Sequence, residues 1–179
     1  MQKLKFLKPA LSLLIITVGV ALLLSLVNHI TADRIVENNL REKREAIARI
    51  FPEVDVFETA EISNLPTTVT EAGTVKGSDG KIIGYYAQIA PVGFKDSINM
   101  IVGTDINGSV TEVVCLSSSE TAGVGTKATT PEYLVRFTSL DSERAKTVDT
   151  ITGATISSKA VRLGISEACV AVSMVKEAE

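Results

Sequence analysis

Hydrophobic residues are unevenly distributed along this chain. Residues 9–27, PALSLLIITVGVALLLSLV, contain no charged side chain and are almost entirely apolar, whereas the sequence after Asp33 mixes apolar and polar positions. At about 1.5 Å of rise per residue, a helix of this length covers the roughly 30 Å hydrocarbon core of a bilayer. The segment therefore predicts a transmembrane helix.

A cleavable signal peptide is the alternative interpretation of this segment, because Lys3, Lys5 and Lys8 resemble a positively charged n-region. The apolar run is longer than the ~7–15 residues usual for a signal peptide, and polar sequence follows it where a small-residue cleavage site is expected. These features favour an uncleaved anchor. Since the lysines flank the span on its N-terminal side, we expect that end in the cytoplasm and the rest of the chain outside.

A helical period continues in residues 32–52, ADRIVENNLREKREAIARIFP. An apolar stripe runs along one face among charged residues, and Pro52 ends the pattern. The stripe consists of Val36, Leu40, Ile47 and Phe51. Such a helix either continues the transmembrane helix as a stalk or packs on the following domain, and packing is the commoner outcome for an amphipathic helix.

The middle of the chain has the pattern of strands. Residues 74–91 predict a strand, a Ser-Asp-Gly turn and a second strand. Residues 98–117 predict another hairpin, in which Asn107-Gly108 supplies the positive φ that a tight turn needs. Two successive hairpins indicate an antiparallel sheet, whereas residues 53–72 show no clear pattern.

Helices are expected again in the last third. Residues 131–137 predict a short helix that begins at Pro131. A longer helix is expected from Ser157 onward, with Ser157 or Ser158 as its N-cap. Its apolar face consists of Val161, Ile165, Ala168, Cys169, Val172 and Val175.

The pattern as a whole predicts an α+β fold with a single N-terminal transmembrane helix. Residues 1–31 form the cytoplasmic N-terminus and the anchor, and residues 32–52 form a membrane-proximal helix. Residues 53–179 form a domain of an antiparallel sheet and packed helices, which we expect outside the cytoplasm.

Charge excludes one class of function. The chain has 18 Lys and Arg against 21 Asp and Glu, and residues 1–32 hold three Lys and no acid. Residues 33–179 therefore hold 15 of the basic and all 21 acidic side chains, a formal charge of −6. A nucleic-acid-binding domain is expected to show a basic face, so we exclude nucleic acid as a partner.

The chemistry of the chain is concentrated in residues 149–158, DTITGATISS. Thr155 precedes the expected last helix, where free backbone N–H groups and the helix dipole favour a phosphate. The segment is neither a Walker site nor a hydrolase elbow, because it lacks the lysine of the first and the Ser-centred pattern of the second. A hydroxyl-rich helix cap explains the same residues.

A glycine-containing loop, residues 117–133, precedes this segment. Gly123 and Gly125 lie two residues apart, which would let the backbone approach a ligand closely, although an ordinary flexible connection explains the spacing equally well. No metal-binding spacing is present, so the sequence predicts no metal site.

Two motifs resemble a known family. Residues 149–155, Asp-Thr-Ile-Thr-Gly-Ala-Thr, resemble the D-x-x-[ST]-G-A-T flavinylation motif. This motif belongs to the FMN-binding domain shared by the G subunit of Rnf complexes and the C subunit of sodium-pumping NADH:quinone reductases. Residues 119–128, SETAGVGTKA, resemble the E-T-P-G-L-G-x-K loop of these subunits, with Ala122 where proline is usual. Residues 102–116 resemble the strand-turn-strand that leads into this loop.

The resemblance implies a covalently bound FMN, attached by a phosphoester to the hydroxyl of Thr155. It also implies that the neighbouring motif residues bind the cofactor, namely Thr152, Gly153, Ala154, Glu120, Thr121, Gly123, Gly125 and Lys127. Asp149 belongs to the signature that the flavin transferase reads, although an Asp here could equally fix the turn through an Asx hydrogen bond. No catalytic residue is expected, since FMN itself carries the redox chemistry.

The function that the resemblance implies is electron transfer in a membrane complex. An Rnf complex couples electron flow between ferredoxin and NAD to sodium or proton translocation, with other membrane and soluble subunits as partners. The short chain favours Rnf over the quinone reductase, whose C subunits commonly carry a longer soluble domain. Two alternatives stay open, a membrane-anchored FMN-binding sensor and an assembly subunit without a cofactor.

Overall fold

The computed structural model describes residues 3–178 and divides into two compact units, Met1–Glu42 and Lys43–Glu179. The first helix, α1 (Lys3–Ile50), crosses this division. The division lies inside the segment that the sequence predicts as a membrane-proximal helix.

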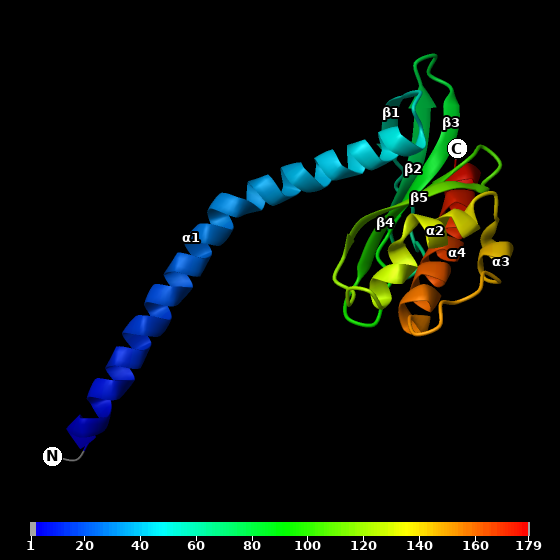
Figure 1. Cartoon of the computed structure of the whole chain (residues 1–179). Coiled ribbons are helices and arrows are strands. Elements are labelled where there is room, and N and C mark those ends of the chain that lie inside the picture. The colour runs from blue at the N-terminus through cyan, green and yellow to red at the C-terminus, as the bar shows by residue number, and fades with distance from the viewer. Residues whose placement is uncertain (1–2, 179) are drawn as a thin grey trace. The chain divides into compact units, whose positions relative to one another are not determined.

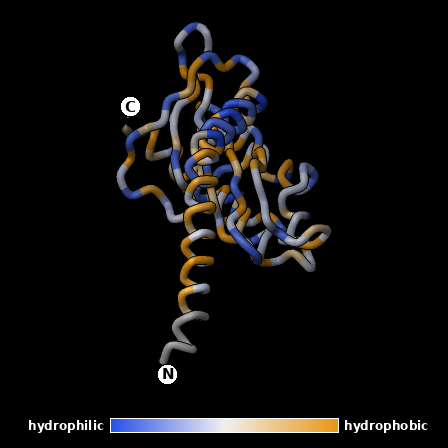
Figure 2. The backbone as a smooth tube through the Cα atoms, turned by 90° about the vertical axis from the view of Figure 1, so that its left-hand side faces the viewer, coloured by the Kyte–Doolittle hydropathy of each residue, from blue (hydrophilic) through white to orange (hydrophobic). Residues whose placement is uncertain are grey.

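The N-terminal part of α1 is long and apolar enough to cross a membrane, with a mean hydropathy of 2.7 over its most apolar window. Its large apolar side chains between Leu11 and Ile30 are 49–67% exposed. Figure 2 shows these apolar residues along the N-terminal part of the helix, followed by hydrophilic ones. A bare apolar helix of this length is stable where lipid covers it, which agrees with a membrane anchor.

The membrane-proximal segment is part of the same helix. Val36 and Leu40 are 59% and 51% exposed, whereas Ile47, Ile50 and Phe51 are buried. The C-terminal half of the apolar stripe therefore packs on the domain, as expected. Its N-terminal half, with Val36 and Leu40, belongs to the first unit.

Five strands form one antiparallel sheet in the order β1-β2-β3-β4-β5. They are β1 (Val54–Thr59), β2 (Val69–Gly77), β3 (Ile82–Ile89), β4 (Ile98–Thr104) and β5 (Val110–Ser118). The two predicted hairpins are confirmed as β2–β3 and β4–β5, and Gly108 has the expected positive φ of 92°. The strand β1, which lies in the segment without a clear sequence pattern, pairs with β2 at the edge of the sheet.

Both faces of the sheet are covered (Figure 1). The long helix α4 (Thr155–Ala178) lies on one face, and its predicted apolar residues are buried there against the strands. The last turns of α1 pack on the other face, where Gly84 and Gly103 leave room for Phe51 and Ile50. An added Cβ at these glycines would come within 2.5 Å of the Phe51 ring and 2.4 Å of Ile50 Cγ2.

Short helices connect β5 to α4. They are η1 (Gly125–Thr129), α2 (Pro131–Leu134), η2 (Val135–Phe137) and α3 (Ser142–Ala145). The short helix expected from Pro131 is confirmed, and the fold is α+β as expected.

The predicted N-cap of the last helix is wrong. The α4 helix begins at Thr155, and Ser158 N already donates to Ala154 O at 2.9 Å. Ser157 and Ser158 therefore lie inside the first turn, and both are buried. Their side chains form hydrogen bonds with other groups and do not cap the helix. Thr155 is the first residue of the helix, whereas the sequence predicts it just before the helix.

Candidate functional site

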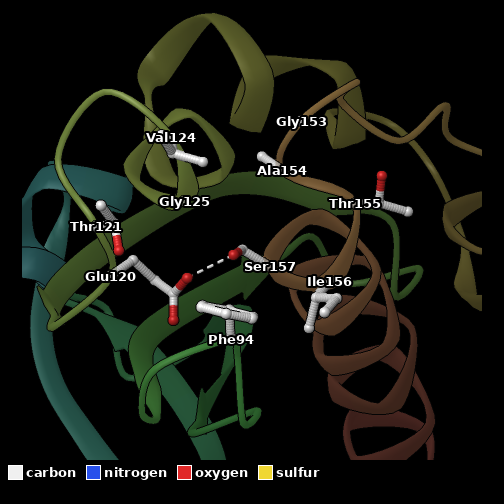
Figure 3. A pocket seen from close by; sticks show the side chains of 10 residues that line it. All are labelled: Phe94, Glu120, Thr121, Val124, Gly125, Gly153, Ala154, Thr155, Ile156 and Ser157. Carbon is white, nitrogen blue, oxygen red and sulfur yellow. Dashed lines mark hydrogen bonds between the residues drawn. The ribbon is translucent and has the colours of Figure 1, made fainter.

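A pocket of about 320 Å³ lies where three segments meet in the second unit (Figure 3). The β3–β4 loop, the loop after β5 and the first turn of α4 each contribute residues. Its lining consists of Phe94, Glu120, Thr121, Val124, Gly125, Gly153, Ala154, Thr155, Ile156 and Ser157.

The motif segment enters the pocket through a tight turn. Ala154 N donates to Ile151 O at 2.9 Å. Gly153, which lies between them, has a φ of 81°, a backbone conformation that residues other than glycine rarely adopt. The Ser158 hydroxyl fixes this turn from inside the helix, because it accepts from Ile151 N at 3.1 Å and donates to Ala154 O at 2.8 Å. The turn places Ala154 and Thr155 in the lining of the pocket.

Glu120 is buried in the pocket wall and joins the three segments. Its Oε2 accepts a hydrogen bond of 2.5 Å from Ser157 Oγ (Figure 3). Its Oε1 accepts one of 2.9 Å from Lys95 N. Gly93 and Gly125 leave room for this carboxylate. An added Cβ at either glycine would come within 2.5 or 2.3 Å of a Glu120 oxygen.

The environment of Glu120 keeps it ionised. Burial acts to raise its pKa, but the hydrogen bonds from Ser157 and from the backbone N–H groups of Lys95, Asp96 and Phe94 outweigh burial and hold the pKa below the ordinary 4.5. The stability that this ionised carboxylate contributes to the fold is therefore fully present at pH values above its ordinary pKa. It is lost as the pH falls through the lower pKa of the folded state.

Thr155 is the exposed hydroxyl of the motif at this pocket. Within residues 3–178 its side chain makes no hydrogen bond, and Figure 3 shows the hydroxyl turned away from the Glu120–Ser157 pair. The N–H groups of a first helical turn lack intrahelical acceptors, and the helix dipole adds a positive potential there. The position therefore combines an exposed hydroxyl with a helix N-terminus that stabilises a phosphate.

Six of the residues expected to bind the cofactor line this pocket, namely Thr155, Gly153, Ala154, Glu120, Thr121 and Gly125. Three others lie outside its lining. Thr152 is exposed, Gly123 N donates to Thr126 Oγ at 3.0 Å with a φ of 73°, and Lys127 is an exposed residue of η1.

Asp149 also lies outside the lining. Its backbone carbonyl accepts from the Tyr133 hydroxyl at 3.2 Å, whereas its exposed side chain makes no hydrogen bond within the described part of the chain. The structure therefore shows no Asx bond that would give Asp149 the role of fixing the turn.

Sequence reasoning missed four lining residues as site residues. Val124 and Ile156 lie beside predicted site residues, so their place in the motifs is the available signal. Ser157, predicted as a cap, instead donates to Glu120. Phe94 lies in the loop between two hairpins, where no feature of the sequence marks it.

Both cysteines are free and lie outside the pocket lining. Burial raises the pKa of Cys115, and burial with the nearby Asp141 raises the pKa of Cys169 to about 11. Both are therefore neutral thiols at physiological pH, so neither has the thiolate character of a reactive cysteine.

A family model described as the FMN-binding domain matches residues 93–170, a range that contains every residue of the pocket lining. The G subunit of the Na⁺-translocating ferredoxin:NAD⁺ oxidoreductase complex of Acetobacterium woodii is 28% identical over 181 residues, which cover 89% of this chain and 87% of that protein. The G subunit of the ion-translocating oxidoreductase complex of Methanosarcina acetivorans is 30% identical over 166 residues, covering 86% and 87%.

The chain belongs to the G subunits of Rnf-type ion-translocating oxidoreductase complexes.

As an Rnf G subunit, it has an electron-transfer role in an oxidoreductase of several subunits, and FMN is its cofactor. The apolar helix and these relatives together indicate a membrane-anchored protein. The pocket has the chemistry that FMN requires. Its helix N-terminus and exposed hydroxyl suit the phosphate, and its apolar side chains Phe94, Val124 and Ile156 suit a flat ring.

Proposed function

We propose that this Rnf G subunit carries FMN covalently, through a phosphoester to Thr155, and relays electrons in ferredoxin:NAD oxidoreduction coupled to sodium or proton translocation. The proposed linkage is supported by the burial and hydrogen bonding of the hydroxyl groups at the pocket. Of the hydroxyl side chains in residues 149–158, only those of Thr155 and Ser157 line the pocket, and the buried Ser157 hydroxyl donates to Glu120. Thr155 is exposed and without a hydrogen-bond partner among the described residues.

Other hydroxyls near the site are less suitable. Thr152 is exposed but lies outside the lining, and Ser158 is buried and bonded to the turn. Thr121 lines the pocket, but it belongs to the loop and not to a helix N-terminus. Thr155 is therefore the hydroxyl that a flavin transferase can reach at a position where the phosphate charge is stabilised.

The residues of the chain bind and orient the cofactor, and FMN supplies the redox chemistry when bound. The first turn of α4 holds the phosphate. The ionised Glu120, which accepts from Ser157, repels a phosphate placed beside it, so we expect the neutral ring near Glu120 and the anionic end at Thr155. The motif around Thr155, including Asp149, provides the surface that the transferase reads.

The intact mass of protein purified from its native membrane tests the linkage. We expect the mass of the chain plus one FMN minus one water, and we expect the flavin to stay with the chain after acid denaturation. Flavin released by acid would support a sensor that binds FMN without a covalent bond. Native protein with no flavin at all would support an assembly subunit. The protein must come from cells that contain the flavin transferase, since other hosts would give the unmodified chain.

We also propose an orientation in which the N-terminus is cytoplasmic, the chain crosses the membrane once and residues 33–179 lie outside. The three lysines before the span and the absence of acid there support it. Protease added to intact right-side-out cells should therefore digest the FMN-binding domain. A domain protected in such cells, and digested only in inverted vesicles, would require the opposite orientation.

A further inference from the structure

Phe94 is an exposed aromatic side chain in the wall of the pocket. It is 70% exposed, while Val124 and Ile156, which line the same pocket from two other segments, are 47% and 54% exposed. Single exposed apolar residues are ordinary in proteins, but three that converge on one concave site indicate a surface that a ligand covers. Figure 3 shows Phe94 beside Ile156, below the Glu120–Ser157 pair.

The loop that carries Phe94 is held in place. Gly93 N donates to Asp96 O and Ile98 N donates to Pro91 O, both at 2.9 Å, which closes the loop on itself. Lys95 N donates to Glu120 Oε1, so the residue after Phe94 is tied to the buried carboxylate. Phe94 is therefore exposed in a fixed position and not as part of an unrestrained loop.

Glu120 links this loop to the helix that carries Thr155. One carboxylate oxygen accepts from the loop and the other accepts from Ser157 in the first turn of α4. The distance between the Phe94 wall and the helix N-terminus is thus set by one buried side chain. The charge of Glu120 also opposes a phosphate at its end of the pocket, which leaves that end to the uncharged ring of the cofactor.

We propose that Phe94 packs against the isoalloxazine ring as the outer wall of the flavin pocket, and that Glu120 is the residue that positions it. This inference rests on the proposed attachment of FMN at Thr155. Aromatic rings pack edge-to-face or offset-stacked, and either arrangement shields part of the flavin from solvent. The ring in turn covers apolar surface of Phe94 that is otherwise in water.

Collisional quenching of flavin fluorescence by iodide, at constant ionic strength, measures this shielding. In the full chain with covalent flavin, Phe94→Ala should raise the quenching constant roughly two-fold, because one side of a flat ring loses its cover. Phe94→Leu should restore most of the protection, since leucine keeps an apolar side chain of similar reach. Thermal unfolding should stay close to that of the unchanged chain, because the exposed Phe94 side chain adds little to the core.

Val92→Ala is the matched control. Val92 lies on the same loop and is 72% exposed, but it does not line the pocket. Its replacement should leave iodide quenching unchanged. Equal quenching in Phe94→Ala and in the unchanged chain, with the flavin mass present in both, would overturn the proposed role of Phe94 and would leave the linkage to Thr155 unaffected. Absence of the flavin mass from the native unchanged chain would instead overturn the linkage to Thr155, and this inference with it.

Discussion

Thr155→Val is expected to abolish covalent attachment of FMN while leaving the fold intact. Valine keeps the size and branching of threonine and removes only the hydroxyl that would form the phosphoester. Thr155 is exposed at the first position of α4, and its hydroxyl makes no hydrogen bond within the described residues, so little folding free energy is lost. In-gel flavin fluorescence and intact mass should both show the unmodified chain, and electron flow through the complex should be lost.

Three further variants serve as controls for this experiment. Thr152→Val and Thr121→Val each remove an exposed hydroxyl close to the site and should retain flavin at near-normal or partly reduced amounts. Ser158→Ala removes the acceptor of Ile151 N and should lower attachment only partly, through a loosened turn. Flavin fluorescence that survives denaturation of Thr155→Val would show that the phosphoester is on another residue.

The elements with strong periodicity could be predicted from the sequence. The β2–β3 and β4–β5 hairpins and the buried face of α4 follow alternation and helical spacing that persist over many residues. The short strand β1 has only six residues and no regular alternation of buried and exposed positions, since Asp55, Val56, Glu58 and Thr59 are all exposed. Its pairing with β2 is determined by tertiary contacts that a local pattern does not contain.

The candidate site could be predicted only in part, because its parts come from distant segments. The two motifs place Thr155 and Glu120 among the site residues, but neither spacing shows that Glu120 is hydrogen-bonded to Ser157 across 37 positions. That bond also explains why the cap prediction is wrong. From the sequence, a buried serine that donates a hydrogen bond to a carboxylate cannot be distinguished from a serine that caps a helix. Phe94 is brought to the pocket by the fold, and no sequence motif marks it.

Gly125 is the second position where a large effect is expected, because its missing side chain leaves room for Glu120. The sequence suggests that this glycine allows the backbone to approach a ligand. The structure adds a contact within the protein, since an added Cβ would lie 2.3 Å from Glu120 Oε2 and 3.0 Å from Ser157 Oγ. Gly125→Val should therefore displace the carboxylate, break its bond to Ser157 and release the loop that carries Phe94.

The expected cost of Gly125→Val is about 1–3 kcal/mol of unfolding free energy from overpacking, and more if Glu120 is left buried without its donors. Flavin content and the flavin absorption spectrum should change along with stability, because the displaced groups form the pocket wall. Gly93→Ala should produce a milder form of both changes, since its Cβ would meet the other oxygen of the same carboxylate at 2.5 Å.

Gly80→Ala separates lost stability from a damaged site. Gly80 has a φ of 75° in the β2–β3 turn, so alanine there is strained, yet its Cβ would meet no atom within 4 Å. This variant should lose stability, as judged by urea unfolding, and keep a native flavin content and spectrum. If Gly125→Val keeps them as well, Glu120 does not hold the pocket in its flavin-binding form, and the loop is only a connection between β5 and α2.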